Sequence, residues 1–564
     1  MEEREYIIIL RDFNDLDQFY EDMESRYGDN EIPSRVVECA YRRPSSRSTH
    51  YYLTDQEALE VAKDSRVQAI ELNYRDKGVN ISPLSGSQYS DGWDKSGTNN
   101  PNHVNWGLYR GFTRNPVSNW GADGTPSVSG QINLLQIGRN VDVVIIDGHM
   151  VAGHPEWAVN ADGTGGTRLY RYNWFSHNQV VRGIDTTEYK YDFPAGTDGD
   201  HDHGNNVGAI AAGNTCGWAR GANIYNICPY GSTSNATGYS NYGYDIINYV
   251  REWHRNKPIN SITGRKNPTI CNMSYGFNIG VFINSSFRIY FQGAEFIKPK
   301  SGWTISDRIK FGLLTGDAFS ANPTAFFQIR DESIDADVAD AVADGIIMVG
   351  AAGNFYGYND VPGGLNYNNA LSKSFFGGIA NIPGYFYCRG PSPSCAPGAI
   401  SVSAVDHTVL ERKPEFSNAG PRTDIFSPGS NIMGAGYTSG VPDPRNSSFK
   451  KFKSGGTSQA SPQVTGVIAC ALELNPSMTP VQAREYIRSI ATADQLYDQS
   501  FNTTIPNDWF KQNSLYGGPN LYLAYPRDTT LERATQGAVH PKYNYRSRGA
   551  SGQCWPRVKA YTRR

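Results

Sequence analysis

Four separated segments carry side chains that could together break an amide or ester bond by nucleophilic attack. Such chemistry needs a hydroxyl beside an imidazole, a carboxylate on the far ring nitrogen, and hydrogen-bond donors where an oxyanion develops. The segments, in chain order, are VVIIDGHMVAGHPEW, DGDHDHGNNVGAIAAG, VGAAGN and GGTSQASPQVTGVIACAL. We predict one acting residue in each: Asp147 as the orienting carboxylate, His203 as the general base, Asn354 as an oxyanion donor and Ser458 as the nucleophile.

These four residues stand at positions where a strand ends or a helix begins. Asp147 follows the apolar run VVII, which predicts a place at the carboxyl edge of a buried strand, where open α/β sheets have their sites. His203 and Ser458 each precede a run of small or apolar residues that is typical of a closely packed helix. A serine at a helix start is close to free backbone N–H groups and to the positive end of the helix dipole. Asn354 follows Gly353 on a turn, from which its amide can project into a cleft.

A second histidine and a group of carboxylates precede the predicted base. His201 is a poor candidate, because only His203 is followed by Gly204 and has the right spacing to the small-residue helix. The nearby carboxylates could hold a hard cation, but we favour a solvated acidic loop: Asp198, Asp200 and Asp202. The eight cysteines form no CxxC pair or other zinc-ligand spacing. The sequence therefore predicts no metal site.

The elements that would hold these residues lie between 141 and about 500. Five short apolar runs are bounded by Gly, Asn or Pro: VDVVIID, GANIYNI, PTICNMS, GIIMVGAAG and GAISVSAV. Continuous apolar runs of this length are typical of parallel strands that helices cover on both faces. Before the fourth run, Ile334, Val338 and Val342 form one apolar helical stripe. We therefore predict an α/β fold with a doubly wound, mostly parallel sheet.

The rest of the chain divides into further parts. Residues 1–75 show strand, helix and strand twice over, which predicts a small N-terminal ferredoxin-like α+β domain. Residues 76–140 are rich in Gly, Asn, Ser and Asp and predict a linker and an irregular surface arm. The α/β domain is expected at 141–530. A basic tail at 531–564, with no Asp or Glu from Arg533 onward, is interpreted as a solvated or partner-docking extension.

The composition gives no sign of a polyanionic partner. The formal net charge is only −3, so we expect neither nucleic acid nor a membrane surface as a partner. No stretch has the length and apolar character needed to span a bilayer, and the start MEEREYIIIL carries no export signal. We therefore expect a cytoplasmic or virion-associated protein. Cys388 and Cys395 could form a local disulfide, which the missing export signal disfavours.

The four segments resemble the Asp, His, Asn and Ser signatures of the subtilisin-like (subtilase) family, in the family's chain order. His154-Pro155-Glu156, GWARGANIYNI and FSNAGPRTDIFSPGSNI resemble further family segments. The resemblance implies a serine endopeptidase that uses an Asp-His-Ser triad and an acyl-enzyme intermediate. NMSYG resembles the edge strand that pairs with an extended polypeptide substrate. The implied substrate-binding residues are Ser274, Tyr275, Gly276, Gly353 and Gly456.

Residues 1–75 resemble the family's inhibitory propeptide. The resemblance implies a zymogen whose own N-terminal domain helps folding and acts as an intramolecular inhibitor, with its C-terminal arm in the cleft. NWGLYR, which begins at Asn105, resembles the start of a mature subtilisin. Any processing site is therefore expected upstream, near Leu72 to Val79.

The sequence departs from the family pattern beside the predicted triad. Gly148 stands where the family usually has Ser or Thr, so a hydroxyl bonded to the Asp147 carboxylate is expected to be missing. His149 replaces a Gly. Asn205 and Asn206 replace Thr and His after the predicted base. None of these changes removes an essential chemical group.

A calcium-binding loop of many subtilisins is also missing. Only three residues separate Gly213 from Gly217, where that loop would be inserted. We therefore expect no calcium at this place and no cofactor that is required for the reaction. Calcium elsewhere in the chain stays possible.

Two other functions fit the same motifs. A catalytically silent subtilase-like structural or binding protein would keep the triad but have its cleft blocked by an uncleaved N-terminal domain. Insertions at about 279–330 and 355–397 favour this alternative, since they could cover the cleft or form an assembly surface. An esterase-like hydrolase is the third possibility, against which the predicted substrate-pairing strand argues.

Overall fold

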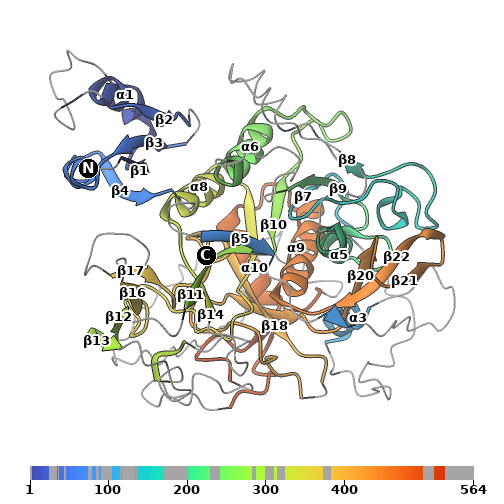
Figure 1. The fold of residues 1–564 in the computed structure, drawn as a ribbon. Coiled ribbons are helices and arrows are strands. Elements are labelled where there is room, and N and C mark those ends of the chain that lie inside the picture. The colour runs from blue at the N-terminus through green and yellow to red at the C-terminus, as the bar shows by residue number, and fades with distance from the viewer. Residues whose placement is uncertain are drawn as a thin grey trace, which may run out of the picture.

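Figure 1 shows the fold of the chain in a computed structural model. The structure describes residues 3–24, 35, 37–43, 46–73, 79–83, 88–89, 105–114, 116, 134, 136–170, 172, 174, 201–228, 242–282, 287–298, 310–313, 324–372, 383–408, 410–499 and 514–526. Among these residues, no helix combines the length and the apolar character that a membrane crossing requires. Asp198, Asp200 and the basic tail 531–564 lie outside the described residues.

A nine-stranded sheet forms the centre of the molecule. In spatial order its strands are β23 (Thr492–Ala493), β24 (Leu521–Tyr522), β19 (Ile425–Pro428), β18 (Ile400–Val405), β15 (Ile347–Ala351), β10 (Thr269–Met273), β7 (Asp142–Ile146), β9 (Asn223–Ile227) and β8 (Leu169–Tyr170). Neighbouring strands are parallel except for the antiparallel pair β23–β24. The five apolar runs lie in β7, β9, β10, β15 and β18, which confirms the predicted mostly parallel sheet.

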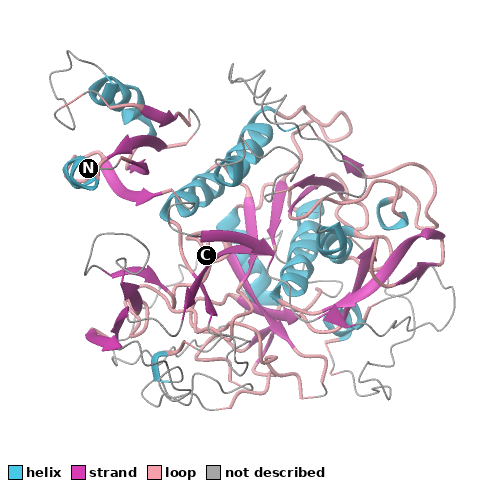
Figure 2. Ribbon diagram, viewed as in Figure 1, coloured by secondary structure: helices cyan, strands magenta, loops and turns pink. Residues whose placement is uncertain are grey.

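Helices cover both faces of this sheet, as Figure 2 shows. One face carries α6 (Tyr242–Asn256) and α8 (Glu332–Ala343), and the other carries α5 (His201–Ala212), α9 (Thr457–Leu474) and α10 (Pro480–Ile490). Alternate side chains of β7 reach the two faces. Val144 and Ile146 belong to the core under α6 and α8, whereas Val143 and Ile145 belong to the core under α5 and α9. All four are fully buried, which is why this strand is apolar at every one of these positions.

The N-terminal residues form a small domain, which is blue in Figure 1. Its elements are β1 (Arg4–Leu10), the 3-10 turn Phe13–Asp15, α1 (Leu16–Glu24), β2 (Cys39–Tyr41), β3 (Ser48–Leu53), α2 (Asp55–Val61) and β4 (Val67–Leu72). The antiparallel strand order β2-β3-β1-β4 confirms the predicted ferredoxin-like topology. Ile8 and Leu10 of β1 face the domain's own core, while Ile7 belongs to the core under α6 and α8. The domain therefore packs with one face of its sheet on the large domain.

A buried arginine joins the small domain to α6 and α8. Arg43 donates from Nε to Asp245 Oδ1 at 3.1 Å and from Nη2 to Asp337 Oδ2 at 2.6 Å. Ser46 Oγ also donates to Asp337 Oδ1, at 2.9 Å, and the Tyr41 hydroxyl donates to Asp245. The Arg43 side chain has no exposed surface. Because a buried charge without a partner is strongly destabilising, these contacts define how the small domain docks.

The segment 76–140 contains more regular structure than expected. β5 (Val79–Pro83) pairs antiparallel with β11 (Tyr275–Phe282), and β6 (Gln88–Tyr89) pairs antiparallel with β22 (Asn446–Ser454). α3 (Trp106–Thr113) places Trp106 and Leu108 in the core under α5 and α9. The prediction of an irregular surface arm is therefore wrong for these three elements. Local patterns could not show the two strands, because each pairs with a partner far away in the sequence.

The two predicted insertions meet in one sheet. Its strand order is β13 (Ala294–Lys298), β12 (Phe287–Phe291), β16 (Ala370–Ser372) and β17 (Pro383–Phe386). At its end, the first insertion forms β14 (Thr324–Gln328), which pairs with β11 on the side opposite β5. In the second insertion, Cys388 and Cys395 are both free and buried, so the disulfide considered from the sequence is absent.

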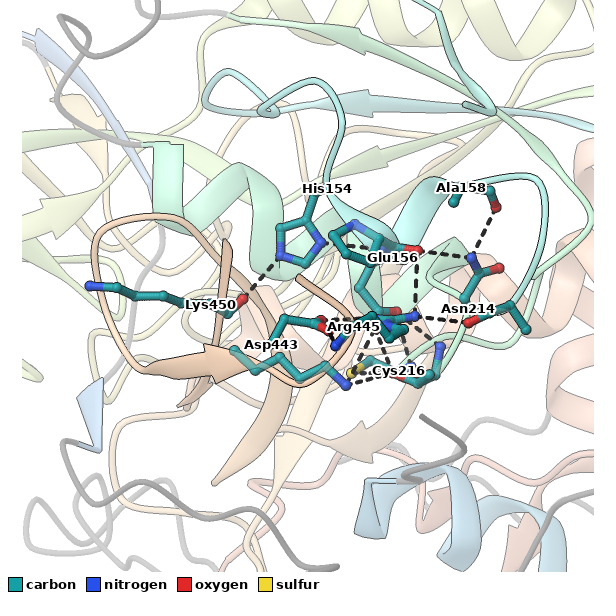
Figure 3. Close-up of polar contacts among 12 residues, drawn as sticks. His154, Glu156, Ala158, Asn214, Cys216, Asp443, Arg445 and Lys450 are labelled. Carbon is teal, nitrogen blue, oxygen red and sulfur yellow. Dashed lines mark hydrogen bonds and ion pairs between the residues drawn. The ribbon is translucent and has the colours of Figure 1, made fainter. Parts of the chain in front are cut away.

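A buried charge cluster attaches α5 to the sheet of β20 (Ile432–Gly436), β22 and β21 (Val441–Asp443), as Figure 3 shows. Glu156, in the 3-10 turn Pro155–Trp157 after β7, is fully buried and pairs with Arg445 and, at 3.5 Å, with Lys451 Nζ. Its Oε2 accepts a hydrogen bond of 2.9 Å from Thr215 N, just beyond α5. Burial alone would raise the pKa of Glu156, but the two cations outweigh it and hold the pKa well below its usual range.

Replacing Glu156 by Gln is expected to lower the free energy of unfolding by about 3 kcal/mol at neutral pH, because Lys451 loses its carboxylate and Arg445 keeps, among the described residues, only the Asp443 carboxylate as a partner. Urea denaturation measures this loss. Because the native pKa of Glu156 is depressed, its contribution is complete above about pH 4.5 and is lost as the pH falls through the native value. The difference between wild type and variant should therefore shrink in acid.

The matched control for this variant is Glu295→Gln. It removes an ion pair with Arg288 in which the two side chains are 42% and 35% exposed, so it should change stability far less. Equal losses from the two substitutions would contradict a special role for the buried cluster.

Candidate active site

The carboxyl ends of the central strands bring the predicted catalytic residues to one edge of the sheet. Asp147 follows β7, Ser274 follows the adjacent β10, and Gly353 lies two residues beyond β15. His203 and Ser458, in the first turns of α5 and α9, contact the first two of these residues. This is the edge at which open α/β sheets place their ligand sites.

A buried carboxylate contacts the predicted base. Asp147 is fully buried, and its Oδ1 lies 2.7 Å from His203 Nδ1 and accepts a hydrogen bond of 2.7 Å from Gly148 N. Among the described residues nothing bonds its Oδ2, in keeping with the hydroxyl expected to be missing at Gly148. Because a buried carboxylate is costly unless it is hydrogen-bonded, the contact favours a proton on His203 Nδ1. The ring then has Nε2 as its basic nitrogen.

The start of α5 lies so close to the loop after β7 that a side chain at Gly204 would not fit. A Cβ at this position would overlap with Gly148 O. The two asparagines that depart from the family pattern attach the same turn to its neighbours. Asn205 Oδ1 accepts from Val151 N at 2.8 Å, and Asn206 Nδ2 donates to a β22 carbonyl at 3.2 Å.

Ser458 is fully buried at the second position of α9. Its Oγ donates to Ser274 O at 3.2 Å, and Ser274 Oγ donates to Ser458 O at 3.0 Å. Gln459 Nε2 donates to Asn206 Oδ1 at 3.1 Å. Because Asn206 and His203 are about one turn apart on α5, this bond holds the start of α9 beside the start of α5. The direct contact of Ser458 with His203 stays a prediction.

Asn354 is anchored beside Ser458 by its side-chain oxygen. Its Oδ1 accepts from Thr457 N and from Thr457 Oγ1, both at 2.9 Å. The same hydroxyl accepts a hydrogen bond of 3.1 Å from Gly353 N. Because Asn354 Oδ1 is bonded to Thr457, its NH₂ group lies on the other side of the carboxamide. An oxyanion donor uses this NH₂ group.

The strand predicted to pair with substrate is paired with the chain's own N-terminal segment. β5 runs antiparallel to β11, with Pro83 opposite Tyr275 and Gly276 at the next position of the register. Tyr275 follows Ser274, whose carbonyl accepts from the Ser458 hydroxyl. The part of β11 nearest Ser458 is therefore occupied.

A second part of the N-terminal segment lies against the strand that leads into α9. In β6, Gln88 pairs with Ser454 at the end of β22. Gly456 is the N-cap of α9, and its N–H donates to Gly429 O at 2.6 Å, which holds the turn before Ser458. β5 and β6 thus lie on the two strands that adjoin the predicted nucleophile.

Asp202 has a contact that the sequence did not reveal. The residue is 8% exposed, and its carboxylate accepts hydrogen bonds from the backbone N–H groups of Tyr437, Thr438 and Ser439, the last two at 2.9 Å. The prediction that Asp202 is a solvated loop carboxylate is therefore wrong. Asp202, the residue before His203, is thus bonded to the loop after β20. No cluster of three or more metal-ligating side chains occurs in the described part of the chain.

Polar residues beneath Ser274 were also missed. Asn272 Nδ2 donates to Ser274 Oγ at 2.8 Å, and Ser461 and Thr465 donate to Asn272 Oδ1 at 3.0 and 3.1 Å. Ser461 and Thr465 are four residues apart in a buried, mainly apolar helix. That spacing is the one signal that could have indicated a buried polar network here.

A family model described as the subtilase family matches residues 138–510. The match covers more than half of the chain, and the chain therefore belongs to the subtilase family.

Individual relatives match shorter stretches. The chain is similar to the subtilisin-like serine protease pepC of Aspergillus niger, with 34% identity over 125 residues that cover 20% of this chain and 21% of that protein. It is similar to the subtilisin-like serine protease Pen ch 18 of Penicillium rubens, with 30% identity over 167 residues that cover 26% of this chain and 31% of that protein. The matches thus span about a fifth to a third of the length of these relatives.

Solved structures show a more distant likeness. Fervidolysin from Fervidobacterium pennivorans, a keratinolytic enzyme related to subtilisin, has a TM-score of 0.46 and 16% identity, covering 95% of this chain and 61% of that one. A cold-adapted subtilisin-like serine proteinase has a TM-score of 0.41 and 20% identity, covering 76% of this chain and 100% of that one. The family assignment rests on the family model alone.

Replacing Gly204 by Ala is expected to destabilise the fold by about 1–3 kcal/mol and to lower the reactivity of the site, because the new Cβ overlaps with a backbone oxygen. Gly208→Ala in the same helix is the matched control. Its Cβ would meet the end of the flexible Met150 side chain, which can rotate away. Urea denaturation and fluorophosphonate labelling measure the two effects. If both variants lose stability and labelling equally, the close approach at Gly204 is not what requires a glycine.

Proposed function

We propose that the chain is a serine endopeptidase in which Ser458 is the nucleophile, His203 the general base, Asp147 its orienting carboxylate and Asn354 an oxyanion donor. The observation that carries this proposal is the 2.7 Å contact between buried Asp147 and His203, at the sheet edge where Ser458 and Asn354 also lie. Membership of the subtilase family supports the same activity.

In the proposed reaction, Ser458 Oγ attacks the carbonyl carbon of a peptide bond while His203 Nε2 takes its proton. Asp147 stabilises the imidazolium that forms and holds the ring through Nδ1. The charge that develops on the carbonyl oxygen meets the Asn354 amide and the N–H groups at the start of α9. His203 then protonates the leaving amine, and water releases the acyl group from Ser458 in a second step. No cofactor takes part in these steps.

We propose in addition that the chain is made as an autoinhibited precursor. Two observations support this: β5 occupies the strand β11 on which an extended peptide would lie, and Ser458 has no exposed surface. The small domain, docked through Arg43, presents β5 to β11 within the same chain. Such a tethered segment competes with free substrate at a high effective concentration.

The register of β5 and β6 indicates which bond the precursor would cut. β5 ends at Pro83 beside Tyr275, and β6 begins at Gln88 beside Ser454. Tyr275 and Ser454 both adjoin the segment that carries Ser458. We therefore propose that the chain cuts itself at one bond between Pro83 and Gln88. The stretch Leu72 to Val79, which the sequence predicted and which ends where β5 begins, stays the alternative position for the cut.

A catalytically silent structural or binding protein is the second candidate. The pairing of β5 with β11 favours it as well, because a permanently occupied edge strand would exclude substrate. The two candidates differ in whether Ser458 ever reacts. An esterase-like activity has less support, because β11 offers a backbone edge that suits an extended peptide.

Incubated wild-type chain is expected to yield two fragments whose boundary lies between Pro83 and Gln88. Ser458→Ala should stay intact, because it lacks the nucleophile. Intact-mass spectrometry measures both proteins, and a fluorophosphonate probe reports on Ser458 in the same samples. An uncut and unlabelled wild type would favour the silent protein, and a boundary between Leu72 and Val79 would restore the earlier hypothesis.

Replacing His203 by Ala should reduce peptide hydrolysis to background, because His203 contacts Asp147, whereas His201→Ala should retain most of it. The wild-type rate should rise with pH in weak acid, since the base acts only when neutral. Fluorogenic peptide hydrolysis across a pH series measures both effects. Equal losses from the two histidine variants would refute the assignment of the base.

A further inference from the structure

We propose that Gln328, oriented by Asn418, selects the substrate side chain immediately before the scissile bond and favours one that ends in a hydrogen-bond acceptor. The proposal rests on the proposed function above and names the substrate class of the same site. Gln328 ends β14, the last element of the first insertion, which resembles none of the family segments identified in the sequence.

The surroundings of the site define where that side chain lies. In the proposed reaction the carbonyl to be attacked lies between Ser458 Oγ and Asn354, and the adjoining substrate backbone takes the place of β5 at the start of β11. The side chain of this residue therefore points between the start of β11 and the segment that follows β15. Gly353, in that segment, has no side chain and adopts a left-handed φ of +113°.

Two carboxamides border this region. A Cβ at Gly353 would overlap with Gln328 Oε1 and would lie 2.5 Å from Asn418 Nδ2. Gln328 is also opposite Asn278 in the β11–β14 register, so it reaches Gly353 from the strand next to the substrate-pairing strand. Gln328 is 4% exposed and Asn418 is 2% exposed. The carboxamides of Gln328 and Asn418 thus lie against Gly353, the residue before the proposed oxyanion donor Asn354.

Asn418 is held firmly and sets the orientation of Gln328. Its Oδ1 accepts from Phe355 N at 3.0 Å and from Gly357 N at 2.6 Å. Its Nδ2 donates to Ala352 O at 3.2 Å and to Gln328 Oε1. With its oxygen engaged, Gln328 keeps Nε2 as a buried donor, and no acceptor among the described residues bonds it.

A buried donor without a partner costs free energy, so this site gains when a substrate brings an acceptor. Glutamine and glutamate side chains end in such oxygens, whereas an apolar chain of similar length would leave Nε2 unpaired. Sites built to hydrogen-bond a substrate group discriminate strongly against analogues that lack the group. The structure therefore points to peptide substrates with an amide or carboxylate side chain before the cut. The proposed self-cleavage lacks this contact, because residues 83–87 read PLSGS, and it relies on the high effective concentration of the tethered segment instead.

The test uses the full chain and fluorogenic peptides that differ only at the residue before the cut, which is glutamine, glutamate or norleucine. Wild type is expected to prefer glutamine over norleucine by about tenfold or more in kcat/KM. Gln328→Met, which cannot donate, should lose this preference. Gln328→Glu keeps the shape but removes the donor, and should disfavour glutamate most. Gln482→Met, on an exposed turn of α10, is the matched control and should behave as wild type.

Fluorophosphonate labelling of Ser458 separates failure of this proposal from failure of the proposed function. Labelled wild type and variant with identical peptide preferences would overturn the role of Gln328 and leave the endopeptidase intact. A labelled wild type that prefers norleucine would also overturn it. A wild type that neither labels nor cleaves any peptide would overturn the proposed function, and this inference with it.

Discussion

The pairing of a buried carboxylate with an imidazole is the constraint on which the rest of the site depends. Asp147 lies at the end of a strand with no exposed surface, so its charge is tolerated only while His203 and Gly148 N bond it. That contact requires α5 to approach the loop after β7 closely enough to exclude a side chain at Gly204. α5 is accordingly held at both ends, by Asp202 beside His203 and by Glu156 at the far end. The position of the imidazole thus results from polar contacts along a whole helix.

Buried charged side chains also connect separate segments elsewhere in this protein, although its net charge is small. Glu156 joins three segments because Arg445 and Lys451 compensate it, and Arg43 joins the small domain to α6 and α8 through two carboxylates. A buried ion pair contributes little net stability compared with apolar packing, but losing one partner is costly. Such contacts therefore specify which surfaces dock. They define geometry where apolar packing alone would allow several arrangements.

The proposed inhibition and the proposed selection of substrate both involve the strand β11. β5 lies on one side of it and β14 on the other, so one strand contacts both the N-terminal segment and the end of an insertion. The backbone pairing that β5 makes with β11 does not depend on the side chains of the paired segment, because any extended segment without an obstructing proline can form it. Side-chain selection then has to come from neighbouring groups, and the Gln328 and Asn418 carboxamides lie in that position. The insertion is thus part of the proposed catalytic surface.

Much of this protein was predictable from local patterns. The apolar runs around Val143 and Ile270 predicted the parallel strands, and the segments of Asp147, His203, Asn354 and Ser458 predicted which residues to look for at the sheet edge. The sequence by itself thus determined the type of the central strands and of the helices that carry His203 and Ser458, and the chemical identity of the candidate site, because strand burial and helix starts depend on neighbours along the chain. Only the tertiary structure decided that β5 occupies β11, that Arg445 and Lys451 compensate Glu156, and that Gln328 lies against Gly353. Each of these contacts joins residues that are distant in the sequence, and their energies come from burial and pairing in space, which no local spacing encodes.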